Sequence, residues 1–494
     1  MYFCWQINRT TLQLKDHLYQ VIESLPGFLP ETWLTVTFLL LILVEILLKN
    51  SRWQTQTTSV LRSLAFGMGL VALSLVFLQW NDPSGYLFHH LLYLDNKAIY
   101  FKILALFAFL FVLLHVQITR TDLPAEFYSI LIAVVLGLFL MAMSVNGLSI
   151  YLSIELVSIG SYLMASLGRS KKSGEGGLKY LLFGALSSAI MLYGLSFLYG
   201  MTGTLDLTSD VFSSQLSQNH PSIVLVVGFL TLAGVLFKLS LVPFHIWVPD
   251  VYEGASTPIV AFLSTAPKVA ALLILMRLLS VLSIDFQRVM AVVALVSILA
   301  GNLSALWQTD LKRLLAYSGI AQAGFILVGL VAFNQTGFES ATFYITVYIL
   351  MNLAAFLLID LIGEGATDLN SFAGKGTSQP LLSICFTIIM VALVGLPPTV
   401  GFTAKLLVFS ALWEANLSAG DGLLVVLLII GLLNAIVSLF YYFKIPFYLF
   451  FRTNTQTLSP RRSFLGESLV ALLTIVIIFL FLKTDWLIGW IKLL

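Results

Sequence analysis

The chain has 494 residues, of which 59% are hydrophobic and only 10% are charged, and its formal net charge is +2. Soluble domains normally carry about 25% charged residues, so this composition excludes a sizeable soluble domain and indicates an integral membrane protein. The near-neutral charge implies no nucleic-acid partner. The two cysteines, Cys4 and Cys385, cannot ligate an iron–sulfur cluster or build a disulfide framework. We therefore expect no cofactor and no metal in this chain.

The first 24 residues do not form a secretory signal peptide, because charged and titratable side chains interrupt them and no apolar run lies between these side chains. These side chains are Arg9, Lys15, Asp16, His17 and Glu23. We expect residues 1–24 to be an N-terminal extension, residues 25–484 a transmembrane domain, and residues 485–494 a short C-terminal tail.

Fourteen apolar runs are candidates for membrane helices, each of which needs about 20 residues. They lie near 32–48, 59–79, 98–118, 125–144, 146–168, 177–200, 222–252, 257–282, 286–308, 310–333, 338–363, 379–417, 421–451 and 464–484. The seventh and twelfth runs are too long for one helix, and prolines interrupt them in SLVPF (240–244) and GLPPTVGF (395–402). The prediction is an all-α bundle of about fourteen transmembrane helices in which helices 7 and 12 are broken.

Basic residues orient this bundle. Those in or beside loops on one side are Lys49, Arg52, Arg120, Arg169, Lys171, Lys172, Lys312, Arg313, Lys375, Arg452, Arg461 and Arg462. Those on the other side are fewer, namely Arg9, Lys15, Lys97, Arg288, Lys483 and Lys492. The positive-inside rule assigns the first side to the cytoplasm, and an even number of spans then places both termini outside.

The two broken helices are separated by five spans, which indicates an internal repeat of five helices covering about 125–282 and 286–451. A repeat with an odd number of spans must insert its second copy upside down. Interrupted helices at corresponding positions of two repeats are the best sequence indication of a transport site. Lys238 precedes Pro243, whereas Lys405 follows Pro398, so inversion would bring both lysines to a comparable depth.

Four charged side chains fall near the middle of predicted spans, where a charge costs at least a few kcal/mol. They are Glu155, Lys238, Lys268 and Lys405. Glu155 is the acid at mid-membrane in its half, and Lys238 is its natural partner, beside a helix break whose free carbonyls would solvate the amine. We expect these four residues to carry protons. The alternatives are a structural ion pair for Glu155, snorkelling for Lys238, and hydrogen-bonded structural lysines for the other two.

His245 lies just past the seventh-span break. A histidine can relay protons near neutral pH, and an equally acceptable interpretation is a structural residue. The other charged or histidine side chains toward span ends are expected to pack, to reach the interface or to be solvated, namely His115, Arg277, Asp360, Glu364 and Lys444. The GKGT at 374–377 lacks the first glycine of a phosphate-binding loop. The driving force must therefore come from a gradient or from partner subunits.

Four stretches carry a resemblance to a known family. They are FKLSLVPFHIWVPDVYEGASTPIVAFLSTAPKVAA (237–271), QTDLKRLLAYSGIAQAGF (308–325), LKYLLFGALSSAIMLYG (178–194) and GLPPTVGFTAKLLVF (395–409). From about Leu25 onward the chain resembles the antiporter-like, Mrp-related membrane subunits of respiratory complex I, and among them the N subunit. The PDVYEGASTP stretch is the discriminating part, since sister subunits and Mrp-type antiporters differ after the shared W-x-P-D.

The resemblance implies a subunit of a proton-pumping NADH:quinone oxidoreductase in a bacterial inner membrane, with both termini on the periplasmic side. The family's functional residues correspond to Glu155, Lys238, Lys268 and Lys405. It implies that partner subunits carry FMN, iron–sulfur clusters and quinone. It also implies contacts with the antiporter-like M subunit, with small membrane subunits and with the lipid bilayer.

Three alternatives stay open at this point. One is a subunit of an Mrp-type sodium/proton antiporter, and another is the equivalent subunit of a relative fed by ferredoxin or F420. The third is a purely structural membrane scaffold, which predicts that apolar replacements of the central lysines are tolerated.

Overall fold

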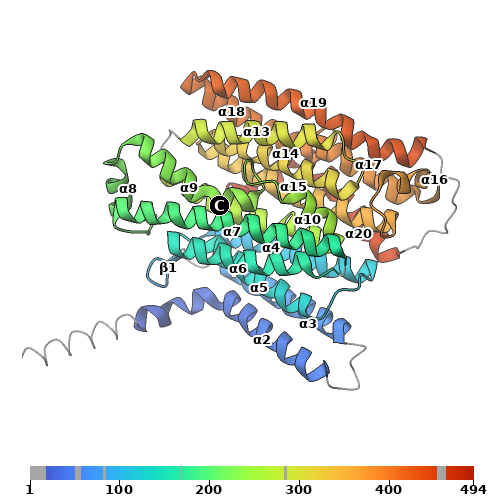
Figure 1. Ribbon diagram of the computed structural model, residues 1–494, viewed down its shortest axis with the longest axis horizontal. Helices are drawn as coiled ribbons and strands as arrows, with labels where there is room; N and C mark the ends of the chain where they lie inside the picture. Colours follow the sequence, from blue (N-terminus) through green and yellow to red (C-terminus); the bar gives the residue numbers. More distant parts are fainter. Residues whose placement is uncertain (1–17, 50–56, 82–84, 169, 283–285, 453–462) are drawn as a thin grey trace, which may run out of the picture.

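A computed structural model describes residues 18–49, 57–81, 85–168, 170–282, 286–452 and 463–494 (Figure 1). Residues 1–17 of the predicted extension lie outside the described residues, whereas 18–24 are helical. The helices before residue 283 are α2 (Leu29–Lys49), α3 (Thr57–Leu78), α4 (Asn96–Thr119), α5 (Glu126–Met143), α6 (Gly147–Ser166), α7 (Lys171–Thr202), α8 (Asp210–Ser217), α9 (Pro221–Leu239), α10 (Val248–Gly254), α11 (Thr257–Leu263) and α12 (Ala266–Val281). One small hairpin pairs β1 (Gly85–Leu87) with β2 (Leu92–Leu94).

The later helices follow the same order as the predicted spans. They are α13 (Phe286–Ala305), α14 (Leu311–Val331), α15 (Gln335–Gly363), α16 (Lys375–Ser378), α17 (Pro380–Val394), α18 (Val400–Ala419), α19 (Gly422–Phe451), α20 (Phe464–Leu482) and α21 (Thr484–Ile491). The short 3-10 helices are η1 (Pro26–Phe28), η3 (Gln79–Asn81) and η4 (Leu369–Phe372). Most of the predicted C-terminal tail is therefore helical.

The predicted spans are present. Thirteen helices of the described ranges are long and apolar enough to cross a membrane. The remaining predicted run, 379–417, is divided into α17 and α18 by turns at 395–399. The seventh run is divided between α9 and α10. The prediction of an all-α membrane bundle with helices 7 and 12 broken is confirmed.

Local chemistry explains both breaks. A proline lacks an N–H donor, and it disfavours helical geometry at the residue before it. Ser240, which caps α9, has a φ of +63°, and Gly395, which caps α17, has a φ of +85°. Cis peptide bonds precede Pro243 and Pro398.

The eighth run differs from the prediction, because it is also interrupted. α11 ends at Leu263 and α12 begins at Ala266. Between them the hydroxyls of Ser264 and Thr265 both donate to the carbonyl of Ala261, at 3.0 and 2.7 Å. Pro267 stands in the first turn of α12, where its missing N–H costs nothing. The sequence predicted one continuous span at 257–282, but two helical segments meet beside Lys268.

The helices lie roughly side by side across Figure 1, with α2 and α3 at one edge and α18 and α19 at the other. Almost all residues of 257–281, α14 and α15 are buried, whereas only about a quarter of the residues of α2 and α19 are buried. The centre of the bundle is therefore formed by α11, α12, α14 and α15. Of the three predicted lysines, Lys268 lies on α12 and Lys405 lies against Phe325 of α14.

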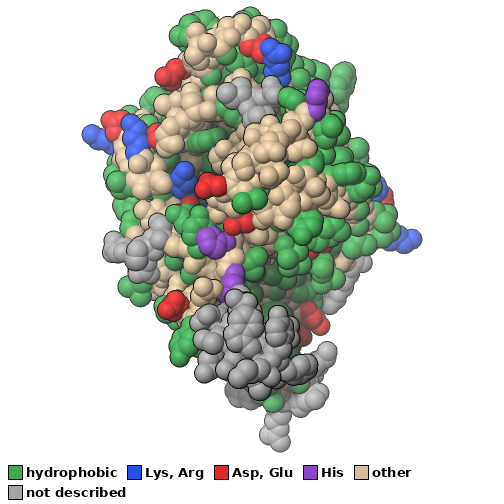
Figure 2. All heavy atoms as spheres, turned by 90° about the vertical axis from the view of Figure 1, so that its left-hand side faces the viewer, with side chains coloured by type: hydrophobic (Ala, Val, Ile, Leu, Met, Phe, Trp, Pro, Cys, Tyr) green, Lys and Arg blue, Asp and Glu red, His purple; other side chains and the backbone are tan. Residues whose placement is uncertain are grey.

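The two ends of the bundle differ in charge. The end with α10 and α16 carries the described basic residues of the first group, here called the basic face: Arg120, Lys171, Lys172, Lys312, Arg313, Lys375 and Arg452. Arg52, Arg169, Arg461 and Arg462 lie outside the described residues. Figure 2 views the opposite end, where α8 and β1 lie and where Lys and Arg side chains are sparse.

Candidate functional site

Lys238 lies in the last turn of α9, and its side chain is only 2% exposed. Glu155 lies on α6 and is the acid that acts electrostatically on this amine. Among the described residues, Lys238 Nζ and Glu155 Oε1 are both buried without a hydrogen-bond partner. The structure therefore brings the two predicted residues near each other without forming an ion pair. The carbonyls of the break do not hold Lys238, which differs from the expectation.

Aromatic rings surround the Lys238 amine instead. Its Nζ lies 5.8 Å from the ring centre of Tyr162 and 5.7 Å from that of Tyr180. The face of an aromatic ring attracts a cation. Trp247, which follows the break, stacks on Tyr180 with ring centres 4.1 Å apart. A Cβ on Gly184 would overlap the Tyr162 hydroxyl, so this position needs glycine.

His245 lies in the turns between α9 and α10 and is half-buried. Within the described part of the chain its Nδ1 has no hydrogen-bond partner. Among the described residues no hydrogen bond joins His245 to Lys238 or Lys268, so its relay role stays a prediction.

Lys268 is held at the centre of the bundle. It lies in the first turn of α12 and is 1% exposed. Its Nζ donates to the carbonyl of Gly319 on α14 at 3.0 Å and lies 5.8 Å from the ring centre of Tyr348 on α15. A Cβ on residue 319 would lie 3.4 Å from this Nζ and 3.1 Å from the Tyr348 hydroxyl. A side chain at this position would therefore crowd the Tyr348 hydroxyl beside the amine.

Lys405 uses the second break. It lies on α18 and is 6% exposed. Its Nζ donates to the carbonyl of Val394, the last residue of α17, at 2.5 Å. The ring centre of Phe325 is 4.5 Å away. A helix that stops leaves its last carbonyls without intrahelical partners, and here one of them binds the amine.

A polar cluster that the sequence analysis did not single out lies between Lys268 and Lys405. Gln322 on α14 donates through Nε2 to the carbonyl of Leu393 at 2.8 Å and to the Tyr442 hydroxyl at 3.2 Å. It accepts from the Tyr344 hydroxyl at 2.6 Å. Ser318 is hydrogen-bonded to Tyr442.

This cluster lies next to the carbonyls that bind the two amines. Ser318 precedes Gly319, whose carbonyl binds Lys268, and Leu393 precedes Val394, whose carbonyl binds Lys405. The signal in the sequence was a glutamine inside an apolar helix.

A buried ion pair was also missed. Lys102 on α4 and Glu31 on α2 approach to 2.6 Å, and both side chains are 0% exposed. The sequence did indicate a buried charge here, because Lys102 lies inside the predicted span 98–118. A second pair at the same end joins Arg277 to Asp95 at 2.9 Å, as the packing role predicted for Arg277 requires. Together the pairs fasten α2, α4 and α12.

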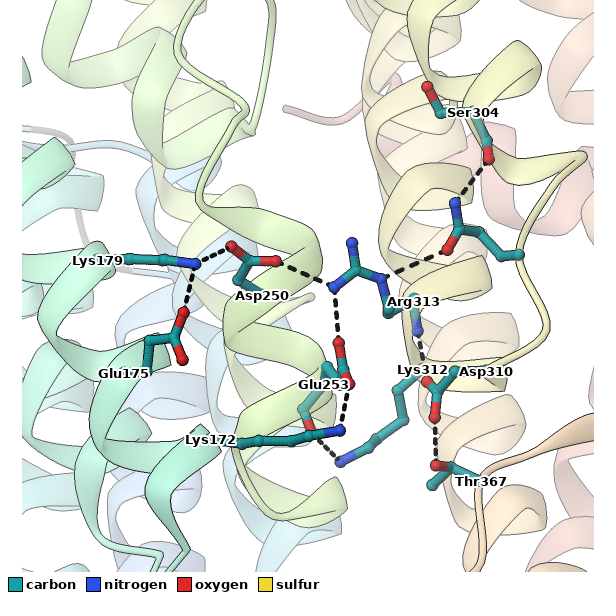
Figure 3. Close-up of polar contacts among 11 residues, drawn as sticks. Lys172, Glu175, Lys179, Asp250, Glu253, Ser304, Asp310, Lys312, Arg313 and Thr367 are labelled. Atoms are coloured by element: carbon teal, nitrogen blue, oxygen red, sulfur yellow. Dashed lines mark hydrogen bonds and ion pairs between the residues drawn. The ribbon is translucent and has the colours of Figure 1, made fainter.

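The PDVYEGASTP stretch anchors the basic face (Figure 3). Asp250 and Glu253 on α10 bind Arg313 of α14 at 3.0 and 2.6 Å. On the α7 side, Asp250 accepts from Lys179 and Glu253 from Lys172, each at 2.7 Å. The hydrogen bond from Lys172 is the main cause that lowers the pKa of the Glu253 carboxyl, and partial burial opposes it. The short helix α10 therefore ties the first predicted repeat to the second.

The remaining predicted residues have structural contacts. The Lys444 amine donates to the carbonyls of Leu306 and Gln308, which agrees with packing. His115 pairs with Asp360 at the end of α15. Within the described ranges no group of three His, Cys, Asp or Glu side chains is placed to hold a metal ion.

Comparisons with known proteins agree with this geometry. A family described as NADH:quinone oxidoreductase/Mrp antiporter, transmembrane, matches residues 144–437. NADH-quinone oxidoreductase subunit N 2 of Chloroherpeton thalassium is 38% identical over 475 residues, covering 91% of this chain and 90% of that protein. NADH-quinone oxidoreductase subunit N of Coxiella burnetii is 34% identical over 485 residues, covering 94% and 98%.

Solved structures show the same fold. A chain of respiratory complex I from Thermus thermophilus with bound aureothin superposes with a TM-score of 0.79 at 28% identity, covering 93% of this chain and 98% of that chain. A chain of the Mrp complex from Dietzia sp. has a TM-score of 0.82 at 19% identity, covering 95% and 96%. The chain therefore belongs to the NADH:quinone oxidoreductase/Mrp antiporter family, in the branch of the N subunits of NADH-quinone oxidoreductase.

Proposed function

We propose that this chain is the proton-translocating N subunit of an NADH:quinone oxidoreductase, a translocase subunit without a redox centre of its own. The observation that carries the proposal is the set of three buried lysines, each beside an interrupted helix, in a chain of the N-subunit branch. A purely structural subunit would not need buried amines that lack a carboxylate partner, because burying a charge is costly. The relatives favour this function over an Mrp-type antiporter.

Each lysine has a different role in this proposal. Lys238, near Glu155, holds a proton that the charge of Glu155 stabilises. Lys268 receives it at the centre of the bundle, and Lys405 releases it through the second break. The Gln322 cluster fills the space between the last two amines. His245 remains a candidate relay beside the first break.

The energy comes from partner subunits. FMN, iron–sulfur clusters and quinone belong to those subunits, and electron transfer there changes the electrostatics around Glu155. The surface of α6 that contains Glu155 fits such a partner, because Leu148, Leu152, Ile159 and Leu163 on it are about half exposed. We assign this surface to the antiporter-like M subunit, and other exposed apolar surfaces to small membrane subunits and lipid.

The proposed location is the bacterial inner membrane, with the basic face in the cytoplasm and both termini in the periplasm. The proposed organisation is two inverted repeats, 125–282 and 286–451. The arrangement of the two breaks supports this inversion, since Lys238 lies before its break and Lys405 lies after its break.

The test uses the whole complex in sealed vesicles. Lys268→Met and Lys405→Met are each expected to abolish most NADH-driven proton uptake, because a thioether cannot hold a proton. Reduction of hexacyanoferrate by NADH, which needs only the redox subunits, should stay normal and reports assembly. Lys444→Met is the matched control, a partly buried lysine that also binds backbone carbonyls. Unchanged proton stoichiometry in both central variants would refute the proposal. The subunits and cofactors that purify with the chain identify the electron donor.

A further inference from the structure

A cavity of about 770 Å³ opens on the basic face between the ends of α4, α15 and α20. It is here called the vestibule, and its polar lining includes Arg120, Thr257, Lys312, Asp360, Glu364 and Ser463. A cavity of this size whose lining includes these polar groups holds many water molecules. Nothing in the proposed lysine series accounts for a water-filled space at this end of the bundle.

Asp360 in the wall of the vestibule is paired with a buried histidine, His115. Asp360 Oδ2 and His115 Nε2 are 2.9 Å apart. Asp360 lines the vestibule and is 12% exposed, whereas His115 on α4 is 0% exposed. Within the described chain, His115 Nδ1 is buried without a hydrogen-bond partner. The pair thus has one member exposed to the vestibule and one member inside the protein, and carboxyl and imidazole groups are side-chain types that can carry a proton.

The helix that carries Asp360 leads from the vestibule to the central lysine. Residues four apart on a helix are neighbours on one face. From Asp360 toward the N-terminus of α15, this face carries the row Phe356, Asn352, Tyr348 and Tyr344. Asn352 donates to the Ser264 hydroxyl at 2.6 Å, in the interruption between α11 and α12. The Tyr348 ring lies beside the Lys268 amine, and the Tyr344 hydroxyl binds Gln322.

One step of this row is apolar. Phe356 packs against Tyr252 of α10, with ring centres 6.1 Å apart in an edge-to-face arrangement. In this row Phe356 stands between Asp360 and Asn352. A proton that leaves the pair along this row must therefore cross an apolar step, which water has to bridge.

We propose that the Asp360–His115 pair is the proton entrance of this subunit. Asp360 takes a proton from vestibule water and shares it with His115 across the Oδ2–Nε2 hydrogen bond. The pair then gives the proton to water admitted beside Phe356, and water beside the polar side chains of this row carries it to Lys268. This inference rests on the proposed function of Lys268 as a proton carrier.

Three other charged groups face the vestibule and set its field. Asp360 acts electrostatically on Lys312, whose amine is fixed by hydrogen bonds to the carbonyls of Glu253 and Ala255, both at 2.9 Å. Arg120 and Glu364 line the same space. Glu364 offers a matched control, because its replacement removes one negative charge from the same vestibule and leaves the Asp360–His115 pair intact.

The first experiment compares Asp360→Asn, Asp360→Glu and Glu364→Gln in the complete complex in inverted vesicles, whose cytoplasmic face points outward. NADH:quinone turnover is measured against the outer pH, with hexacyanoferrate reduction as the measure of assembly. Asp360→Asn should slow turnover roughly tenfold or more, and most strongly at alkaline outer pH, where protons are scarce. Asp360→Glu should restore most of the rate. Glu364→Gln should follow the wild-type profile.

Two outcomes overturn the inference. One is a wild-type rate and pH profile in Asp360→Asn. The other is a loss that is equal at every pH and is not restored by Asp360→Glu, because a purely structural pair would behave in this way. If Lys268→Met also pumps normally, the proposed function fails as well. If only the Asp360 result is negative, the proposed function stands and the entrance lies elsewhere.

The second experiment tests water access directly. Asp360→Cys is made in a background with Cys4→Ser and Cys385→Ala, and a membrane-impermeant thiol reagent is added. Labelling is expected in inverted vesicles and not in right-side-out vesicles. Labelling only from the opposite side would place the vestibule in the periplasm and overturn the assignment of the entrance.

Discussion

Gln322 and Lys405 bind neighbouring carbonyl groups at the end of α17. Gln322 Nε2 donates to Leu393 at 2.8 Å, and Lys405 Nζ donates to Val394 at 2.5 Å. Two free carbonyls of one interrupted helix therefore position an amide on α14 and an amine on α18. The break is a binding element that sets where the Lys405 amine lies, as well as an interruption of the helix.

Replacing Gln322 should disturb this arrangement. Gln322→Leu removes a hydrogen-bond partner from the Leu393 carbonyl and from the hydroxyls of Tyr344 and Tyr442. Each buried polar group that is left unsatisfied lowers the stability by about 1–3 kcal/mol. We expect lower proton uptake per NADH in sealed vesicles. The matched control is Gln287→Leu, because Gln287 also donates to a helix-end carbonyl, that of Val331, at 2.8 Å. Equal effects of the two variants would mean that Gln322 has only a packing role.

Gly184 should not tolerate a side chain. A Cβ there would overlap the Tyr162 hydroxyl, so Gly184→Ala must displace the ring beside Lys238. Overpacking a core costs about 1–3 kcal/mol, and we expect a lower thermal midpoint of the purified complex together with reduced pumping. Gly174→Ala on the same helix meets nothing within 4 Å and should leave both properties unchanged. A tolerated Gly184→Ala would argue against a fixed position of Tyr162.

The Glu31–Lys102 pair should show strong coupling. Removing one partner of a buried pair leaves an uncompensated charge and costs about 3–5 kcal/mol. Glu31→Gln and Lys102→Met should each lower the thermal midpoint more than the double variant, because the double variant buries no charge. The control is Arg288→Gln, which breaks the ion pair between Arg288 and Asp421. The Arg288 side chain is 75% exposed, so this variant should change the free energy of unfolding by less than about 1 kcal/mol. Additive effects of Glu31→Gln and Lys102→Met would contradict this account.

The Glu253 network predicts a defined pH dependence. The pKa of Glu253 is lowered in the folded state, chiefly by the hydrogen bond from Lys172. Its stabilising contribution is therefore complete above the pKa of an unfolded glutamate, about 4.3, and is lost as pH falls through the lower folded value. Glu253→Gln should lower the thermal midpoint at pH 7 by a small amount, because water screens partly exposed charges. The difference from wild type should shrink in acid, and a difference that grows in acid would contradict the prediction.

Much of the fold could be predicted from the sequence because membrane physics is local. A run of about 20 apolar residues predicts a membrane helix whatever its neighbours are. Pro243 and Pro398 interrupt helices because the proline ring removes the N–H donor and restricts the backbone. Lys238, Lys268 and Lys405 could be selected because an amine in an apolar run is costly in any arrangement. These inferences needed no knowledge of which helices touch.

The missed features all depend on contacts between distant segments. Glu31 lies before its apolar run, and only the packing of α2 against the rest of the bundle places it on Lys102. Gln322 acquires a role because α14 lies beside the end of α17. The interruption at Ser264 depends on hydroxyls that donate to a backbone carbonyl of the preceding turn. Counting apolar residues in 257–282 does not reveal this pattern.

The position of α10 has a mechanical consequence. Arg313 holds this short helix to α14, and Lys172 and Lys179 hold it to α7. The turns from Ser240 to Trp247 join α10 directly to the last turn of α9, where Lys238 lies. A small displacement of α14 relative to α7 would therefore pull on this linkage and alter the cage of rings around the Lys238 amine. The salt bridges on the basic face form a mechanical link through which movement in one half of the bundle reaches Lys238, the proposed proton carrier, in the other half.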